Sequence, residues 1–288
     1  MNVAPMALME SPLGGILAWF LFCGLFGFMT AILCLLAHAA SQKTPVPKWR
    51  SQHSRVHLLI VLGSGGHTAE MFSMLRHIKL DPAKYTNRTY VVSSGDNFSA
   101  TKAAEFESTL VDRGAEPQSY NIVTVPRARR VHQSYLTAPF STIRSFYSCL
   151  LVLRGVHPDQ QSWPADLLPV PYPDIILTNG PAIAVCIILA ARLLRLYHSF
   201  SSFLSPQRLH SHPRSMAGPA ADGTTPHSGV FRLRTIFVES WARVTTLSLS
   251  GKILLPFADR FLVQWPALEG KKALWGVKKA EYVGFLVD

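Results

Sequence analysis

The residues best suited to chemistry lie in the segment LLIVLGSGGHTAEM, residues 58–71, where an apolar run ends in a glycine-rich turn that carries a histidine. Glycine lets the backbone approach a ligand closely and adopt positive φ angles. The amides of Gly65, Gly66 and His67 are expected to open a helix, and the N-terminus of a helix attracts phosphate groups. The segment therefore predicts a pyrophosphate-binding turn that contains no lysine.

Two side chains beside this turn could do more than bind. A neutral imidazole at His67, at the ligand edge of a sheet, can accept a proton from an attacking hydroxyl group. A histidine that only packs or caps the helix is the alternative. Glu70 lies one turn further along the expected helix. It either orients a substrate hydroxyl or supports the start of the helix, and we favour the supporting role.

Two familiar phosphate-binding loops fit this segment poorly. A P-loop requires a Gly-Lys-Ser/Thr sequence, and no lysine is present here. The dinucleotide pattern G-x-G-x-x-G matches at Gly63 and Gly65, but Thr68 stands at the third glycine position. Ser93 or Ser94 stands where an acidic ribose partner is expected. A membrane-tethered, dinucleotide-dependent oxidoreductase therefore remains only as an alternative function.

The composition narrows the class of partner. The chain has 288 residues, of which 48% are hydrophobic, and a net charge of +11, so it can bury a proper core and attract an anionic partner. No nucleic-acid-binding module is recognisable, and an acidic membrane surface accounts for the charge equally well. The four cysteines form no C-x-x-C motif, and we expect neither a disulfide framework nor a metal site.

The N-terminal region predicts a membrane anchor. Residues 13–37 are uncharged and long enough to cross the hydrocarbon core of a bilayer, which is about 30 Å thick. Basic residues follow this run and none precedes it, which places the N-terminus in the lumen and the body in the cytosol. A cleaved signal peptide is disfavoured because the run is too long and lacks a basic start. Two glycosylation sequons, beginning at Asn87 and Asn97, provide a check on this topology.

The remaining chain alternates apolar runs with helical patterns, which predicts an α/β fold with a Rossmann-like, doubly wound parallel sheet. Ligands in such sheets bind beyond the carboxyl ends of the strands. The apolar part of the helix expected from residue 182 is too short to span a bilayer, so we expect it to be buried or membrane-facing. The expected strands are 57–62, 88–94, 120–125, 174–178, 234–240, 260–265 and 281–287, and the expected helices between them include 68–78, 98–113 and 139–154.

These observations give a domain organisation. The predicted parts are a short luminal N-terminus (1–12), a transmembrane anchor (13–40), a linker (41–56) and a Rossmann-like body (57–288) with a flexible Ser-, Pro- and His-rich insertion (198–229).

The glycine-rich turn, GSGGHTAEM, resembles that of the Alg14 family, the membrane-anchored subunit of the UDP-N-acetylglucosamine transferase of dolichol-linked oligosaccharide synthesis. Further stretches resemble the family in the same order and extend over nearly the whole chain beyond Val56. These are VVSSGDNFS, VPRARRVHQSYLT, PDIILTNGPA, FVESWARVTTLSLSGKIL and DRFLVQWPAL.

The resemblance implies the N-terminal half of a split GT-B glycosyltransferase, with no cofactor and no catalytic metal. A soluble catalytic subunit would supply most of the UDP-GlcNAc site. The anchored half would hold the acceptor, GlcNAc-pyrophosphate-dolichol, and recruit this partner to the cytosolic face of the endoplasmic reticulum membrane, where the second GlcNAc is added with inversion. This chain would be inactive alone.

The resemblance also implies roles for individual residues. His67 would be the catalytic base for the acceptor 4-hydroxyl. The acceptor would be bordered by Gly63, Ser64, Gly65, Gly66, Thr68, Glu70, Asn179 and Gly180. Lipid phosphates would meet Arg127, Arg129 and Arg130, although a solvated basic loop fits these arginines equally well. A donor-side or a structural role is left open for Glu239, Ser240 and Arg243.

Two positions depart from the family pattern, and the C-terminus follows it. Ala182 and His132 stand where glycine is expected. The closing sequence YVGFLVD resembles the family's tail, which docks the catalytic subunit. A plain edge strand is the alternative for this tail.

Overall fold

The computed structural model describes residues 55–116, 119–129, 133–134, 137–161, 172–180, 182–204, 233–272 and 278–287, together with scattered positions between 16 and 37. The chain divides into two compact units, Met1–Lys43 and Thr44–Asp288. The described positions of the first unit are helical. Most of the predicted anchor and linker, and residues 205–229 of the predicted insertion, lie outside the described residues.

The second unit is built on a seven-stranded parallel sheet with the order β3-β2-β1-β4-β5-β6-β7. The chain winds outward from β1 in one direction and then crosses to β4 and continues in the other, as in a Rossmann-like fold. The parallel sheet predicted from the apolar runs is therefore confirmed. The strands are β1 His57–Val61, β2 Asn87–Ser93, β3 Tyr120–Val125, β4 Ile175–Asn179, β5 Arg234–Val238, β6 Arg260–Val263 and β7 Glu281–Tyr282.

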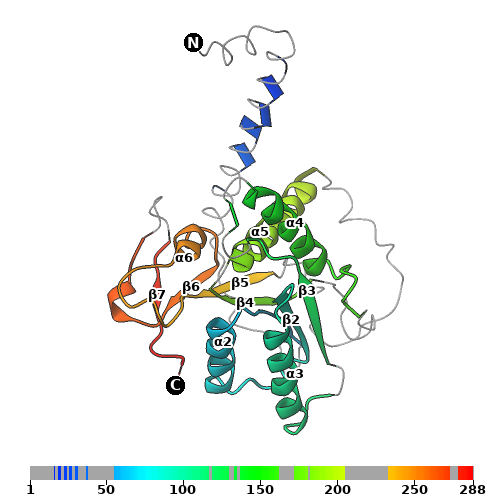
Figure 1. The fold of residues 1–288 in the computed structure, drawn as a ribbon, viewed down its shortest axis with the longest axis vertical. Helices are drawn as coiled ribbons and strands as arrows, with labels where there is room; N and C mark the ends of the chain where they lie inside the picture. The colour runs from blue at the N-terminus through cyan, green and yellow to red at the C-terminus, as the bar shows by residue number, and fades with distance from the viewer. Residues whose placement is uncertain are drawn as a thin grey trace, which may run out of the picture. The chain divides into compact units, whose positions relative to one another are not determined.

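Helices cover both faces of the sheet. The helices α2 and α3 lie on one face, and α4, α5 and α6 lie on the other (Figure 1). Because each strand–helix connection returns the chain to the start of the next strand, the turns that follow the strands gather at one edge. The helices are α2 Gly66–His77, α3 Asn97–Val111, α4 Ala138–Leu153, α5 Ala182–Leu204 and α6 Leu249–Leu254, with a short 3₁₀ helix at Pro266–Leu268.

Burial on both faces explains why β1 is a continuous apolar run. All five of its residues are buried, and its backbone pairs with β2 on one side and β4 on the other. The helix α2 packs on this strand through Met71, Met74 and Leu75, as its spacing predicts. The helix was predicted to run to Ile78, but α2 ends one residue earlier, and Ile78, its C-cap residue, is 51% exposed.

The helix α5 is longer than the sequence indicated. It runs for 23 residues to Leu204, so residues 198–204, which we assigned to the insertion, are helical. Contacts at this end include the ring of His198, which lies edge-on to Tyr172. Among the described residues, α5 is the one helix with the length and apolar composition to cross a membrane, over Ala182–Ser201. Since 56% of that stretch is buried, its apolar character also matches that of a core helix.

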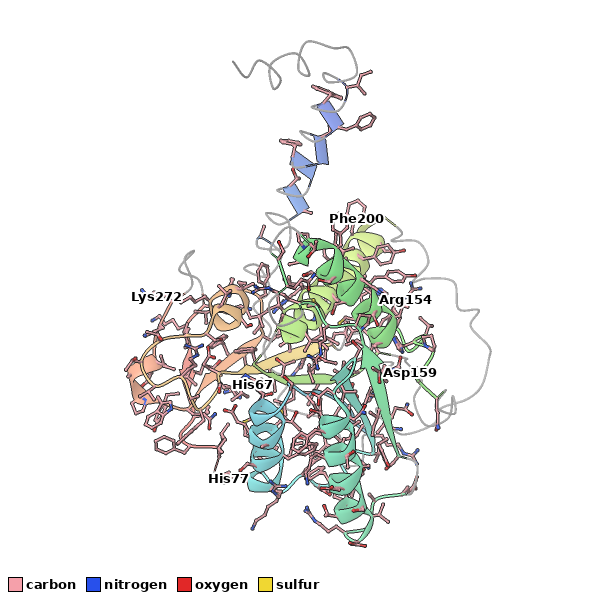
Figure 2. All side chains as sticks on the ribbon, in the orientation of Figure 1. His67, His77, Arg154, Asp159, Phe200 and Lys272 are labelled. Atoms are coloured by element: carbon pink, nitrogen blue, oxygen red, sulfur yellow. The ribbon has the colours of Figure 1, made fainter. Side chains whose placement is uncertain are left out.

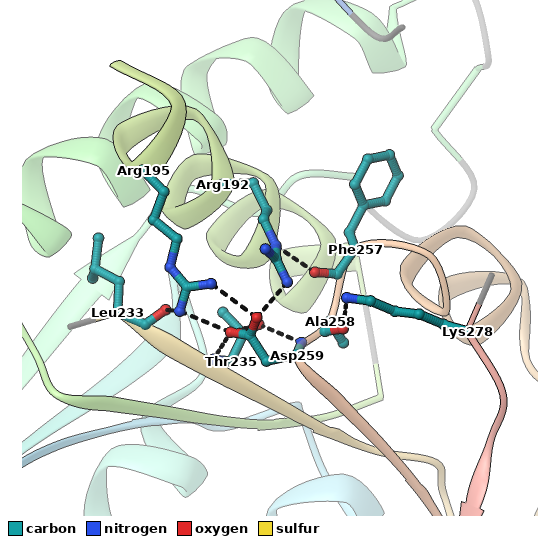
Figure 3. A network of polar contacts seen from close by, with 8 residues as sticks. All are labelled: Arg192, Arg195, Leu233, Thr235, Phe257, Ala258, Asp259 and Lys278. Carbon is teal, nitrogen blue, oxygen red and sulfur yellow. Dashed lines mark hydrogen bonds and ion pairs between the residues drawn. The ribbon is translucent and has the colours of Figure 1, made fainter. Parts of the chain in front are cut away.

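An ion-pair cluster fastens α5 to the second half of the sheet (Figure 3). Arg192 and Arg195 both reach the carboxylate of Asp259, and their closest contacts measure 2.5 and 2.8 Å. The same carboxylate accepts a hydrogen bond from the amide of Thr235 at the start of β5. Burial alone would raise the pKa of Asp259, but the two guanidinium groups outweigh it and lower the pKa to about 2.

The C-terminal strand is much shorter than predicted. Pairing with β6 involves only Glu281 and Tyr282, whereas the strand was expected over 281–287. Gly284 adopts a φ of +79°, which turns the chain out of the extended conformation. The remaining tail follows the end of the sheet without further strand pairing.

Candidate functional site

The turn between β1 and α2 has the backbone of a ligand-binding loop. Residues 64–66 are exposed, and Gly65 has φ 61° and ψ −119°, a conformation that is open essentially only to glycine. No side chain caps the N-terminus of α2, and its first turn contains no acidic residue. The first amides of the helix therefore have no partner within the helix and can meet an anion.

A buried chain of hydroxyl groups fixes this turn from behind. The hydroxyl of Thr68 donates to the carbonyl of Gly63 and lies 2.6 Å from the hydroxyl of Ser99. Ser99 in turn donates to the carboxylate of Asp96, which caps α3. Thr68 is fully buried, so the structure places its side chain behind the turn rather than on its ligand side.

The imidazole of His67 lies between the turn after β1 and the turn after β4, at the edge of the sheet where the strands end (Figure 2). A Cβ atom on Gly180 would lie only 2.7 Å from Cγ and Nδ1 of His67, so the ring packs directly against this glycine. The side-chain amide of Asn179 donates to the carbonyl of His67 over 2.8 Å. The structure thus brings together His67, Asn179 and Gly180, three residues that the sequence analysis selected.

The carboxylate of Glu70 connects His67 to the turns that follow β5 and β6. Its Oε2 lies 3.5 Å from Nδ1 of His67 and 3.5 Å from the side-chain nitrogen Nδ2 of Asn179. Its Oε1 accepts hydrogen bonds from the backbone amide of Trp241 and from the side chain of Gln264. Trp241 follows β5 and Gln264 follows β6, so one carboxylate joins the ends of several strands.

The contacts of Glu70 favour its ionised form. Burial alone would raise the pKa of this carboxyl, but its interactions with His67, the Trp241 amide and Ser240 outweigh burial and hold the pKa below its ordinary value. Glu70 is 8% exposed, and it therefore acts from inside the protein. The sequence analysis favoured a role in supporting the start of the helix, but no side chain caps α2, and the support that Glu70 gives goes to the turns after β5 and β6.

Two polar atoms at the site remain without a hydrogen-bond partner in the described part of the chain. They are Oδ1 of Asn179, whose residue is fully buried, and Nδ1 of His67, which lies within ion-pair distance of Glu70, at 3.5 Å, without forming a hydrogen bond. Buried polar atoms are normally satisfied, so an unsatisfied one calls for a ligand, a water molecule or another physical explanation. The Asn179 oxygen can accept a hydrogen bond from a ligand hydroxyl or amide.

The arginines predicted to meet lipid phosphates, Arg127, Arg129 and Arg130, lie in the loop that follows β3. Arg127 donates through Nε to the carbonyl of Ser94 over 2.9 Å, which links this loop to the end of β2. Arg129 is exposed and donates to the carbonyl of Gln133. Arg130 and His132 lie outside the described residues. In the sheet β3 is separated from β1 by β2, and the printed contacts of the two described arginines reach Ser94 and Gln133, so the structure does not bring them to the glycine-rich turn.

The residues after β5 form a support for α6. Glu239 is fully buried and accepts hydrogen bonds from the amides of Ser240 and Ser248, and Ser248 is the N-cap of α6. Burial raises the pKa of Glu239 above its ordinary value despite these bonds. Ser240 is buried, whereas Arg243 is exposed. These contacts favour the structural role for Glu239, one of the two roles left open by the sequence.

Sequence reasoning missed an aromatic group beside Glu70. The indole of Trp265 donates to the carbonyl of Trp241, and its ring also contacts Phe285 in the tail. Gln264 was missed as well, and it binds both Glu70 and the amide of Leu286. Within the part of the chain that the structure describes, no group of three or more His, Cys, Asp or Glu residues is placed to hold a metal ion.

Comparison with known proteins assigns the family. The family model described as "Oligosaccharide biosynthesis protein Alg14 like" matches residues 58–286. The UDP-N-acetylglucosamine transferase subunit alg14 of Aspergillus fumigatus is 57% identical over 231 residues, which cover 76% of this chain and 100% of that protein. The Schizosaccharomyces pombe subunit is 36% identical, covering 86% of this chain and 87% of that protein. The human subunit is 31% identical, with coverages of 80% and 82%.

No solved structure matches this chain. The relatives give no support to a dinucleotide-dependent oxidoreductase, the alternative that the glycine pattern had left open. The family model covers the glycine-rich turn and the carboxyl ends of the strands that form the site. This chain therefore belongs to the Alg14 family.

Proposed function

We propose that this chain is the membrane-anchored, acceptor-binding subunit of a heteromeric UDP-GlcNAc transferase. In this proposal it recruits a soluble catalytic subunit and holds GlcNAc-pyrophosphate-dolichol at the cytosolic face of the endoplasmic reticulum while the second GlcNAc is added. The relatives support the first part, since they are named as subunits of a UDP-N-acetylglucosamine transferase. The acceptor, the membrane and the orientation are inferred from the sequence and from the site.

The observation that carries the acceptor assignment is the open turn at the start of α2. Its exposed glycines present backbone amides that no side chain caps, with His67 directly beside them. A pyrophosphate bound to these amides would leave its attached sugar next to the imidazole. The lipid carried on the same pyrophosphate would then extend toward a membrane in which residues 13–40 are embedded.

The geometry supports a single displacement with His67 as the base. The hydroxyl oxygen of the acceptor sugar attacks the anomeric carbon of the donor GlcNAc and forms the new C–O bond, while the bond from that carbon to the UDP oxygen breaks. The hydroxyl proton passes to the imidazole of His67, and UDP leaves with the bonding electron pair. Because attack occurs opposite the leaving group, the anomeric configuration is inverted.

The fold supports a split GT-B arrangement. The described residues of the body form one Rossmann-like sheet, and a GT-B enzyme is built from two such halves. The ligand edge of this sheet includes exposed apolar surface at Trp241 and Phe285, which are 48% and 51% exposed. In the proposed complex the catalytic subunit faces this edge and completes the site.

Reconstitution tests the proposal. The full chain in lipid vesicles, the soluble subunit, UDP-GlcNAc and a lipid-pyrophosphate-GlcNAc acceptor are combined, and transfer of labelled GlcNAc is measured. We expect no transfer by this chain alone and transfer when the partner is present. Transfer by the chain without its partner would contradict the division of labour.

Two substitutions separate binding from chemistry. Gly66→Val places a side chain in the open turn, where a Cβ atom meets no protein atom within 4 Å, so we expect a higher KM for the acceptor without loss of stability. His67→Ala is expected to lower kcat by about 10²- to 10⁴-fold while partner binding persists. Ala104→Val, at an exposed position of α3, is the control for adding the same branched side chain to a helix. Unchanged kinetics in both site variants would leave this chain with recruitment alone.

A further inference from the structure

The two ring nitrogens of His67 have different surroundings. Nδ1 is buried, faces the carboxylate of Glu70 at 3.5 Å and lies beneath Gly180. The side chain as a whole is 36% exposed, so the exposed part of the ring lies away from Nδ1. Nε2 is therefore the nitrogen that a ligand can reach, and the protein itself occupies the side of Nδ1.

Glu70 is held on the side away from His67. Its Oε1 accepts from the amide of Trp241 and from Gln264, at 3.2 Å for the latter, while its Oε2 is left to His67 and Asn179. The carboxylate is buried and cannot rotate without breaking contacts with the turns after β5 and β6. A group fixed in this way can impose an orientation on the ring that it faces.

We propose that Glu70 is the positioning residue for His67: it holds the proton of the neutral imidazole on Nδ1 and leaves Nε2 free to take the proton of the acceptor hydroxyl. This inference rests on the proposed role of His67 as the base. The sequence analysis left two roles open for Glu70, and neither of them involved His67.

The arrangement accounts for both states of the ring during transfer. Before transfer, the Nδ1–H group points at Oε2 of Glu70, which fixes the tautomer and the plane of the ring. When Nε2 takes the hydroxyl proton, the ring becomes a cation and the adjacent carboxylate balances its charge. The 3.5 Å separation suits an unliganded site, because catalytic hydrogen bonds often shorten only when substrate binds.

Gln264 extends this arrangement to the C-terminal tail. Its side-chain nitrogen donates to Glu70 and its oxygen accepts from the amide of Leu286 over 3.0 Å. Gln264 is 1% exposed, so both contacts are made inside the protein. The position of Glu70 is therefore set by the tail as well as by the sheet, and loss of Gln264 should loosen the carboxylate without removing it.

A double-mutant cycle in the reconstituted complex tests the proposal. Glu70→Gln keeps an oxygen that can accept from Trp241 and removes the charge that faces His67. We expect it to lower kcat by about tenfold or more, with the acceptor KM changed less than about twofold. In the His67→Ala background the same change should alter kcat by less than about twofold, because Glu70 acts only through the imidazole. Glu70→Asp should recover part of the lost kcat.

Two controls separate positioning from support of the fold. Glu107→Gln makes the same change in another buried carboxylate. Glu107 lies in α3 and forms an ion pair with Arg88 of β2. It should lower the unfolding midpoint and affect kcat by the same factor with or without His67. Gln264→Leu should lower kcat less than Glu70→Gln. All rates are normalised to folded complex, measured by partner binding and by the unfolding midpoint.

The outcomes distinguish this inference from the function on which it rests. If Glu70→Gln lowers kcat equally in the wild-type and His67→Ala backgrounds, Glu70 acts independently and the inference is wrong, while the acceptor-binding function stands. If His67→Ala keeps full turnover, the base assignment and the inference both fail. If the Glu70→Gln chain does not assemble with its partner, Glu70→Asp takes its place in the cycle. Its loss of kcat should then be seen in the wild-type background and be absent in the His67→Ala background.

Discussion

The backbone of Gly180 touches the imidazole of His67 so closely that a Cβ atom there would lie 2.7 Å from Cγ of the ring. Gly180 also has a φ of +73°, a conformation that residues with side chains rarely adopt. Two independent constraints therefore require glycine at this position, which follows β4 directly. The contact helps to position His67, which lies more than a hundred residues earlier in the chain. The two residues meet because parallel strands end at a common edge of the sheet.

Gly180→Ala should therefore damage catalysis more than stability. The added methyl group must push the ring away from its place, and a displacement of about 1 Å at a reacting group can cost up to about 100-fold in rate. We expect kcat of the reconstituted complex to fall by about 10- to 100-fold and the free energy of unfolding to fall by about 1–3 kcal/mol. Transfer kinetics and denaturant unfolding of the full chain in detergent measure the two effects.

Gly114→Ala is the matched control for this substitution. Gly114 has a φ of +94° at the end of α3, and a Cβ atom there would meet no atom within 4 Å. It should show a comparable loss of stability and an unchanged kcat. Equal kinetic losses in the two variants would mean that backbone strain, and not the contact with His67, limits turnover.

Thr68→Val tests whether the hydroxyl chain behind the turn holds it in place. The change preserves shape but removes the bonds of Thr68 to Gly63 and Ser99, and it leaves these buried groups short of a partner. We expect a loss of about 1–3 kcal/mol in the free energy of unfolding and an increase in the acceptor KM. Denaturant unfolding and acceptor titration measure the two.

Thr101→Val provides the comparison on a surface. The hydroxyl of Thr101 donates to the carbonyl of Asn97 at an exposed position of α3, so its removal should cost less than about 0.5 kcal/mol. An acceptor KM that is unchanged in Thr68→Val, despite the loss of stability, would show that the shape of the turn does not depend on this hydroxyl.

The sequence was sufficient to predict the sheet and the first half of the site, for a physical reason. A strand buried on both faces, such as β1, is a nearly continuous apolar run, and the bounds predicted for β1 and for the edge strand β3 differ from the observed ones by one residue or less. The glycine-rich turn and Asn179–Gly180 could be selected because each directly follows such a strand. Chain order and the parallel sheet then bring these two turns together.

The polar interior could not be read in the same way. Arg88 is fully buried in β2 and paired with Glu107 at 2.6 Å, although a sequence pattern alone would place both in solvent. The contacts of Glu70 with Trp241 and Gln264 depend on side-chain directions across turns that are distant in sequence. The tail was expected to be a long strand because its apolar residues resemble one, but Gly284 ends the pairing early.

Lys278, which lies near the ion-pair cluster of α5, should make the stability of the protein depend on pH in the alkaline range. Burial, together with repulsion from Arg192, lowers the pKa of Lys278 from an ordinary 10.5 to about 8, and attraction to Asp259 only partly opposes this (Figure 3). Between pH 8 and pH 10.5 the unfolded chain therefore binds more protons at this lysine than the folded chain does. The contribution of Lys278 to the free energy of unfolding should rise with pH across this window.

Lys278→Met removes the amine that titrates. The free energy of unfolding should then rise less steeply with pH between pH 8 and pH 10.5 than it does in the wild-type chain. The measurement is the difference in denaturant unfolding between the wild-type chain and the variant in detergent, at several pH values from 7.5 to 10.5. Lys279→Met, at the exposed neighbouring lysine, is the control for loss of one positive charge. A difference between the wild type and Lys278→Met that stays constant over the whole range would contradict the lowered pKa.

The two glycosylation sequons give the final prediction, which concerns the side of the membrane on which the body lies. Asn87 is 4% exposed within β2 and is closed to a glycan in the folded protein. Asn97 is exposed at the start of α3, so its state reports the compartment. We expect it to stay bare in cells, seen as no mobility change on endoglycosidase treatment.

An added sequon in a long N-terminal extension should become glycosylated in the same cells, because that end is predicted to face the lumen. Replacing Asn97 by Gln in the extended chain should leave the glycosylated fraction unchanged. A glycan on Asn97 together with a bare extension would place the body in the lumen. It would then be separated from a cytosolic partner, and the proposed recruitment of a soluble subunit could not occur.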